Sequence, residues 1–280
     1  MRCLFCKQDT TDTKSVEHII PESLGNKTFV LPLGYVCDKC NNYFARAVER
    51  PFLELPEIEL LRSQEEVPSK KNRIPTINGL FNGIPVKLKK KVHHGQVIKE
   101  IVWPPENINE IFNIKKTKLI FPAFTNDITF KNNTIISRFI AKVALEALAD
   151  KLKSVENSLN DLIDDIQFDA IRNYARLGNL KEWPCNIRRI YEYDKSWIDK
   201  DNTLWQKIHE SDFLIIKDDS SMSEQQNLVP IALYFVVALY GIEFAINMAG
   251  PEIDGYKKWL IAHNNVSPLY YGKNENSDDL

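Results

Sequence analysis

The chain has 280 residues, of which 44% are hydrophobic and 26% charged, and its net charge is −2. This length has room for more than one domain, and the composition is that of a globular protein rather than a disordered or fibrous one. Five cysteines are too few for a disulfide scaffold. The apolar stretch 228–242 falls short of the roughly 18–20 residues of a membrane span, and the N-terminus has no signal-peptide core. We therefore expect a cytoplasmic protein without a membrane segment.

Four of the five cysteines form two C-x-x-C pairs near the N-terminus: Cys3, Cys6, Cys37 and Cys40. Each pair sets two thiolates on one tight turn, as a tetrahedral Zn²⁺ site with Zn–S bonds of about 2.3 Å requires. We predict a structural four-cysteine zinc site in a small unit, residues 1–50, that ends in a helix from about 38 to 49. The alternatives are two redox dithiols or buried free thiols.

The middle of the chain reads as a short linker and then a basic, strand-rich region. Pro51 and Pro56 are expected to break the chain, and the acidic residues 51–68 to form a helical linker. Residues 69–131 carry 12 Lys and Arg against 4 Asp and Glu, a net charge of +8. Two strands and two turns are predicted within this region: 84–91, 97–103, Asn82-Gly83 and His94-Gly95.

The basic region contains a candidate contact surface for nucleic acid. Strand alternation places Lys87 and Lys89 on one face, with Val86 and Leu88 turned toward the core. Lysines in such a row suit DNA phosphates, because each contact releases condensed counterions. The alternative is the solvated face of a β-hairpin.

Residues 132–280 are expected to form an α+β C-terminal domain of unknown role. Apolar residues at helical spacing predict helices at 133–153 and 159–177, the second ending at Gly178. Three strands are predicted after them: 213–216, a fully buried strand at 231–240, and an alternating strand at 242–248.

The chemistry is expected between the two cysteine pairs. Glu17 and His18, in the run Glu17-His18-Ile19-Ile20-Pro21, place a carboxylate beside an imidazole, and Asn41 directly follows Cys40. This pattern, over about residues 3–50, resembles the HNH endonuclease family in its zinc-containing, stand-alone bacterial branch. The resemblance implies an α+β protein, in which a small N-terminal ββα-metal zinc-knuckle unit is followed by a mixed β/α domain with antiparallel strands.

The resemblance also implies a metal-dependent endonuclease that hydrolyses DNA phosphodiester bonds. His18 would be the general base, since a neutral imidazole with a pKa near 6.5 can accept a proton from water at pH 7. Glu17 and Asn41 would hold a catalytic Mg²⁺ or Mn²⁺, ions that prefer oxygen ligands. The zinc would take no part in the chemistry and would orient the helix that carries Asn41 toward His18.

Two departures from the family pattern shape the remaining expectations. The asparagine that braces the loop in the family would fall near 31–34, where there is none, so Gly34 and backbone hydrogen bonds are expected to replace it. Phe44 stands where a basic residue is expected. Phosphate contacts are therefore expected from other residues along the chain: Lys27, Asn42, Arg46, Lys87 and Lys89.

Alternatives remain for single residues and for the whole protein. Asn41 and Asn42 could cap the helix, and His18 could be a structural histidine. The whole chain could be a zinc-stabilised module that binds nucleic acid or a protein without cleavage. The segment 137–144 resembles the C-terminal halves of bacterial HNH proteins linked to defence against phage. The C-terminal domain is accordingly expected to clamp DNA, form a homodimer or bind a regulatory protein.

Overall fold

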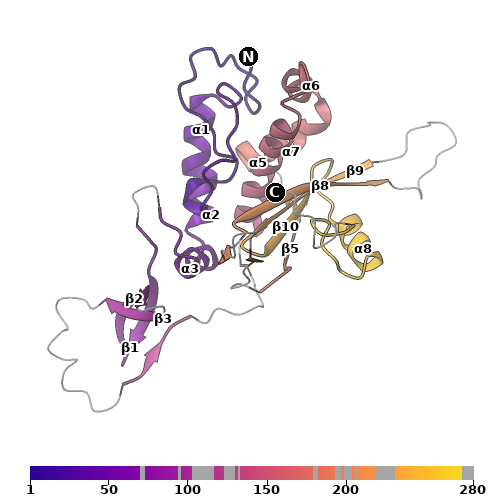
Figure 1. Ribbon diagram of the computed structural model, residues 1–280. Helices are drawn as coiled ribbons and strands as arrows, with labels where there is room; N and C mark the ends of the chain where they lie inside the picture. The colour runs from indigo at the N-terminus through magenta and orange to yellow at the C-terminus, as the bar shows by residue number, and fades with distance from the viewer. Residues whose placement is uncertain are drawn as a thin grey trace. The chain divides into compact units, whose positions relative to one another are not determined.

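The computed structural model describes most of the chain, and every structural statement below refers to the residues it describes: 1–69, 73–93, 96–102, 117–122, 130–131, 133–178, 182–192, 197–198, 204–205, 207–217 and 231–272. The chain divides into two compact units (Figure 1). Unit 1 comprises Met1–Ile20, Asn26–Phe52 and Thr129–Leu280, and unit 2 comprises Pro21–Gly25 and Leu53–Ile128.

The first helical segment starts at the second cysteine pair. Helix α1 (Asp38–Phe44) passes directly into a π-helical turn, η2 (Ala45–Glu49), and then into α2 (Arg50–Leu53) (Figure 1). The backbone N–H of Arg50 bonds to the carbonyl of Ala45, five residues back. The next residue, Pro51, has no N–H to donate, and the wider π turn precedes it. The expectation that Pro51 ends the helix is therefore wrong.

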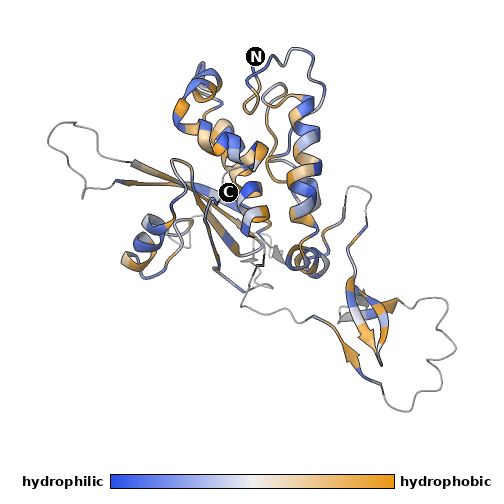
Figure 2. Ribbon diagram, turned by 180° about the vertical axis from the view of Figure 1, so that it is seen from behind, coloured by the Kyte–Doolittle hydropathy of each residue, from blue (hydrophilic) through white to orange (hydrophobic). Residues whose placement is uncertain are grey.

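Three helical segments follow in unit 1: α5 (Asn133–Lys151), α6 (Ser158–Asp164) and α7 (Asp169–Leu177). The first helix is confirmed. The second predicted helix is broken, because Asp165 has an extended backbone and its side chain caps a short 3₁₀ turn, η4 (Ile166–Phe168). Gly178 ends α7 as predicted, with φ of 63°. In Figure 2 the helices of unit 1 carry apolar and polar residues side by side, as amphipathic helices do.

An antiparallel sheet with strand order β5-β10-β9-β8 packs against α5 through β5 and β10. Its strands are β5 (Cys185–Arg189), β8 (His209–Lys217), β9 (Ile231–Leu239) and β10 (Ile242–Asn247). On one face Phe244 packs against Phe52, whose ring stacks at 3.9 Å on Phe139 of α5. On the other face Tyr234 packs against Tyr256 of α8 (Asp254–Ala262). Burial on both faces explains the uninterrupted apolar run predicted for β9.

Strand β10 differs from the half-exposed strand expected, because all six of its residues are buried. The carboxylate of Glu243 is buried with them and accepts hydrogen bonds from Arg188 Nε at 2.5 Å and Tyr256 Oη at 2.7 Å. A third hydrogen bond comes from Ser267 Oγ. This buried charge is paired and hydrogen-bonded, as a buried carboxylate must be.

Unit 2 is built on a second antiparallel sheet, with strand order β3-β2-β1-β4. Its strands are β1 (Ile77–Phe81), β2 (Ile84–His93), β3 (Gln96–Val102) and β4 (Leu119–Ile120). Asn82 and Gly83 join β1 to β2 with φ of 49° and 87°, a two-residue turn of the type that matches strand twist. That turn is confirmed, and the predicted His94-Gly95 turn lies outside the described residues.

The other elements of unit 2 are a 3₁₀ turn, η1 (Glu22–Leu24), and helix α3 (Pro56–Gln64), which contacts β1 and β2. Pro56 occupies the first position of α3, where its missing N–H costs nothing. In unit 1, two short strands, β6 (Trp197–Ile198) and β7 (Leu204–Trp205), pair with each other and belong to neither four-stranded sheet. Among the residues described, none of the helices is both long and apolar enough to cross a membrane.

Candidate functional site

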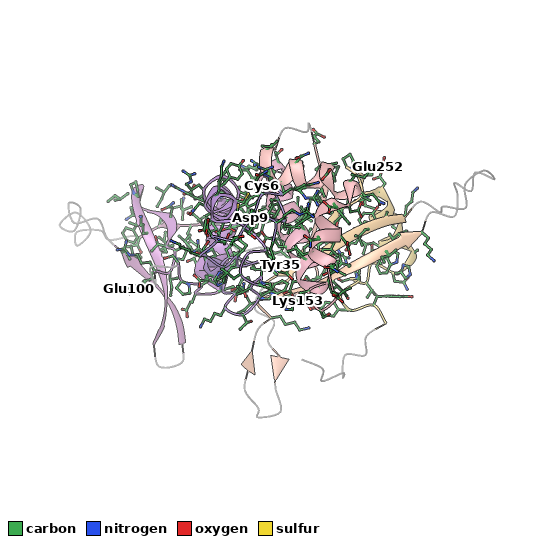
Figure 3. All side chains as sticks on the ribbon, turned by 90° about the horizontal axis from the view of Figure 1, so that it is seen from above. Cys6, Asp9, Tyr35, Glu100, Lys153 and Glu252 are labelled. Atoms are coloured by element: carbon green, nitrogen blue, oxygen red, sulfur yellow. The ribbon has the colours of Figure 1, made fainter. Side chains whose placement is uncertain are left out.

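The four cysteines predicted as metal ligands lie together. Their Sγ atoms are all within 4.8 Å of one another, and those of Cys6 and Cys37 are 3.6 Å apart (Cys6 is labelled in Figure 3). Zinc with Zn–S bonds of about 2.3 Å in tetrahedral geometry would hold its sulfurs about 3.8 Å apart. None of the four cysteines is in a disulfide. The cluster is confirmed, and its four thiols are a donor set that suits zinc.

Hydrogen bonds already favour a thiolate in this cluster. Contact with Cys40, together with backbone N–H groups, lowers the pKa of Cys3 to about 4. The same contact raises the pKa of Cys40. The side chain of Cys37 accepts the N–H of Cys40 and caps α1. The sulfur cluster and the start of α1 are therefore one piece of structure.

His18 lies on a short antiparallel pairing that precedes α1. It bridges Val30, and beside it the N–H of Leu31 bonds to the carbonyl of Glu17 at 2.9 Å. His18 is half-buried, whereas Glu17 and Ile19 on either side are buried, an alternation typical of a strand. The chain thus runs from the His18 segment through the Val30 segment, to which it is bridged, into α1.

Asn41 reaches back from α1 to this same strand. Its Nδ2 donates to Ser15 Oγ at 3.3 Å and to the carbonyl of Val16 at 3.2 Å. These two bonds use the amide nitrogen and leave Oδ1 out. The helix is capped by Cys37, so Asn41 does not serve as the N-cap. The structure thus brings Asn41 next to the segment that carries Glu17 and His18.

Asp38 also ties α1 to the strand, which the sequence did not indicate. Its carboxylate accepts hydrogen bonds from the hydroxyl and backbone N–H of Ser15 and from the N–H of Lys14. These bonds, above all the one from the Ser15 hydroxyl, lower the pKa of Asp38. Asp38 and Asn41, one helical turn apart, therefore both hold the strand against α1.

Asn26 braces the chain in front of the pairing, a role that was missed. Its buried side chain donates to the carbonyls of Ile20 and Phe29, at 2.5 and 2.9 Å. Its Oδ1 accepts the N–H groups of Thr28 and Phe29, at 3.1 and 2.9 Å. At the later stretch 31–34, where Gly34 and backbone bonds were expected to act, Gly34 has a φ of 90° and the N–H of Tyr35 bonds to the carbonyl of Pro32 at 3.2 Å. Asn26 adds a brace at an earlier position, which was not expected.

Glu17 is held by a lysine from outside the N-terminal segment. Its Oε1 lies 2.6 Å from Nζ of Lys142 on α5, and only 4% of the Glu17 residue is exposed. Nζ also lies 2.8 Å from Glu49 Oε1 and 2.9 Å from Glu146 Oε2. The second oxygen of Glu17, Oε2, is buried and has no hydrogen-bond partner.

Burial shifts the pKa values of the carboxylates in this cluster. Burial raises the pKa of Glu17 and raises that of Glu146 well above its usual value, although Lys142 opposes both shifts. Burial alone would lower the pKa of Lys142, and the three carboxylates around it raise that pKa well above its usual value instead. The three carboxylates therefore favour the ammonium form of Lys142.

A lysine-rich surface belongs to unit 2. Lys87 and Lys89 are exposed on β2, while Val86 and Leu88 are buried, which confirms the predicted alternation. Across the sheet, Lys89 stands opposite Glu100 of β3, which is labelled in Figure 3. Residues opposite one another share a face, so Glu100 offsets part of the charge there.

The other expected phosphate contacts lie near the strand pairing in sequence. Lys27, Asn42 and Arg46 are all exposed. Arg46 Nε donates to the backbone carbonyl of Asn42 at 3.3 Å, so the two residues lie on one side of the continuous helical segment formed by α1 and η2. Each is accessible to a ligand, as a phosphate contact must be.

Basic residues dock the cysteine knuckle onto α6 and α7. Arg172, buried on α7, donates from Nε to the carbonyl of Leu4 at 2.9 Å. Arg2 pairs with Asp164 at 2.7 Å and Lys7 with Asp169 at 2.8 Å. Three contacts thus join residues 2–7 to helices that begin more than 150 positions later.

A cluster of four cysteines, a bridged pair of extended segments carrying a histidine and a helix carrying an asparagine together form a small site with a zinc-like cysteine cluster. Residues 3–55 match the family of the HNH endonucleases, so the chain carries an HNH endonuclease domain there. No curated protein and no solved structure matches the chain. The matched range includes the cysteines, Glu17, His18, Asn26, Asn41 and Glu49.

Two residues beside His18 also offer oxygen atoms of the kind that a hard divalent ion binds. Glu17 Oε2 is an orphaned, buried carboxylate oxygen, and Asn41 Oδ1 is an amide oxygen that the hydrogen bonds of Asn41 do not engage. Carboxylate and amide oxygens are the donors that Mg²⁺ and Mn²⁺ prefer. Both donors come from segments that flank His18.

Proposed function

We propose that the protein is a metal-dependent endonuclease that hydrolyses phosphodiester bonds in DNA. The observation that carries the proposal is the juxtaposition within the HNH domain of His18, on the strand pair, and Asn41, hydrogen-bonded to that strand. The cysteine cluster would hold a structural zinc ion, which fixes α1 and therefore Asn41 relative to the strand.

In this proposal, each residue has one task. His18 takes a proton from the attacking water, for which a neutral imidazole is suited near pH 7. Glu17 and Asn41 would hold a Mg²⁺ or Mn²⁺ ion. Such an ion, when bound, supplies Lewis-acid stabilisation of the charge on the phosphate and on the leaving oxygen. Lys27, Asn42 and Arg46 contribute contacts to the phosphate backbone.

The direct test is cleavage of supercoiled plasmid and linear duplex with Mg²⁺, with Mn²⁺ and with EDTA. His18→Ala is expected to reduce the rate about 10²–10⁴-fold, as the loss of a general base does, while zinc content and folding stay unchanged. The matched control is His263→Ala, since His263 stacks on Trp259 at the end of α8 and lies outside the HNH domain.

Two outcomes would refute this proposal. Wild-type rates in His18→Ala would exclude the general-base role. Binding of DNA by the wild-type protein without metal-dependent cleavage would favour the alternative, a zinc-stabilised binding module. A role in defence against phage and a homodimer or regulatory partner stay predictions from the resemblance, and a cytoplasmic location stays a prediction from the sequence.

A further inference from the structure

A lysine from the C-terminal region occupies the centre of a buried carboxylate cluster. Nζ of Lys142 lies within 2.9 Å of oxygens of Glu17, Glu49 and Glu146, and Lys142 itself has no exposed surface. An ammonium group has three N–H donors, and three carboxylates surround this one. Lys142 therefore has its full set of partners.

The three carboxylates come from three different segments. Glu17 immediately precedes His18 on the strand pair, and Glu49 is the last residue of the π turn that continues the helix of Asn41. Glu146 lies one turn along α5 from Lys142 itself. One ammonium group thus joins the strand of the candidate base to the helix of the second proposed metal ligand.

The composition of the cluster points away from a purely structural purpose. One positive charge faces three carboxylates, and Glu17 Oε2 and Glu146 Oε1 are buried without hydrogen-bond partners. Burial of ion pairs is costly, and well-packed apolar side chains would often serve stability as well or better. In the part of the chain that the structure describes, the only group of three or more closely spaced metal-binding side chains is the four cysteines. The three carboxylates therefore surround an ammonium group rather than a vacant metal cage.

We propose that Lys142 is a positioning residue for the nuclease site. It holds Oε1 of Glu17 so that only Oε2 remains for a metal ion, and through Glu49 it fixes the helix that presents Asn41. The inference rests on the proposed function and deepens it: the matched domain, residues 3–55, is incomplete without α5. Groups that orient metal ligands from behind typically contribute 10–100-fold to metal affinity or activity.

The simplest variant, Lys142→Met, removes the ammonium group but leaves three buried carboxylates without a partner, and the chain can then fail to fold. A triple variant, Lys142→Met with Glu49→Gln and Glu146→Gln, reduces this cost because Glu17 is then the single carboxylate left in the cluster. It keeps Glu17 and removes the positioning contacts. The matched control is Lys151→Met, on the same helix, whose side chain is 57% exposed and pairs with Asp212.

Four measurements are made on the full-length protein: zinc content, Mn²⁺ affinity without DNA, kcat and KM for plasmid cleavage, and hydrogen exchange of the Leu31 amide. The triple variant is expected to keep its zinc and its KM, while Mn²⁺ affinity and kcat fall about 10–100-fold. Hydrogen exchange of the Leu31 amide, which bonds to the carbonyl of Glu17, should become at least about tenfold faster. Lys151→Met should match the wild type in all of these.

The outcomes separate this inference from the proposed function. Unchanged Mn²⁺ affinity and kcat in the folded, zinc-loaded variant would overturn the positioning role while leaving the nuclease intact. A wild-type protein that neither binds Mn²⁺ nor cleaves DNA would refute the proposed function instead. The positioning role is then decided by the Leu31 amide, whose unchanged exchange would overturn it and whose faster exchange would support it.

Discussion

Asn26 illustrates how much of the candidate site depends on single side chains that no short motif marks. One amide group satisfies two carbonyls and two N–H groups around the bend that separates Ile20 from Phe29. Asparagine has the smallest side chain that offers two N–H donors together with an oxygen that can accept two hydrogen bonds. Such a brace cannot be deduced from spacing, because its partners are defined only once the chain has turned back on itself.

Asn26→Ala is expected to destabilise the protein and to loosen the strand that carries His18. Each buried backbone group left without a partner costs about 1–3 kcal/mol. Thermal or urea unfolding would measure the loss. Asn42→Ala, at an exposed helical position, should change stability by no more than about 0.5 kcal/mol. Equal stability of the two variants would contradict the bracing role.

Lys142 and Glu17 show the same limit for charged residues. The two are 125 positions apart in the sequence, and their contact is buried. The sequence singled out Glu17 by its place before His18, but it gave no reason to select Lys142 among the residues of an apolar helix. Charge patterns predict partners only at short spacing, where helix or strand geometry fixes the distance.

The helix that contains Cys40 shows what local rules can and cannot predict for an element. Its start was expected from the cysteine pair, and the structure places the cap at Cys37. Its end was expected before Pro51, yet helical structure continues through α2 to Leu53. Proline removes one N–H, and a π turn before it accommodates that loss, so the rule that proline ends a helix fails here.

Because Cys37 is a predicted zinc ligand at the start of α1, and serine can still cap the helix, Cys37→Ser should damage the element through loss of the thiolate ligand rather than alter the chemistry. Zinc content, about one per chain in the wild type, should fall together with thermal stability, since metal binding contributes folding free energy. Elemental analysis and thermal unfolding would measure both.

Cys185→Ser provides the control for this experiment, because Cys185 lies on β5, outside the sulfur cluster. Its zinc content should equal that of the wild type. Mild EDTA treatment should remove the catalytic ion and leave the structural zinc in place. Fully stable and active Cys37→Ser protein without zinc would contradict the assignment.

At the scale of the whole molecule, residues from helices far along the chain contact the HNH domain. Arg172 of α7 bonds to the knuckle at Leu4, and Lys142 of α5 bonds to Glu17. Most of the domain that the family comparison recognises, residues 3–20 and 26–52, is therefore part of unit 1, together with the C-terminal helices and sheet. Unit 2, with the basic strand β2, is a separate body.

Whether unit 2 contributes to the DNA path can be tested through the salt dependence of binding. Changing Lys87 and Lys89 to Gln in a His18→Ala background should weaken binding to all DNA sequences alike. The slope of log affinity against log salt should flatten by nearly one unit for each lost phosphate contact. Lys87 should contribute more, because Glu100 stands opposite Lys89.

The control for this experiment is the pair Lys151→Gln and Lys153→Gln, whose side chains are 57% and 51% exposed on and just beyond α5. Stability should hardly change in either double variant, since exposed lysines contribute little to it. An unaltered salt slope after the change of Lys87 and Lys89 would remove β2 from the DNA path and favour the solvated-face alternative.

The sequence by itself determined the features that depend on local spacing. The two C-x-x-C pairs predicted the sulfur cluster, alternation predicted the exposed row of Lys87 and Lys89, and an unbroken apolar run predicted the buried strand β9. These predictions hold because turns, strands and helices impose fixed periods on the chain. His18, Glu17 and Asn41 were selected for the same reason, by their spacing around the cysteines.

Only the tertiary structure decided which distant side chains complete the site. Lys142 pairs with Glu17, Arg172 holds the knuckle, and Asn26 braces the bend. Each of these bonds joins segments whose separation in space depends on the packing of whole elements. Hydrogen-bond geometry and low dielectric matter most for the buried ones. Because none of these contacts follows from a fixed spacing, the residues that position the site show no periodic pattern in the sequence.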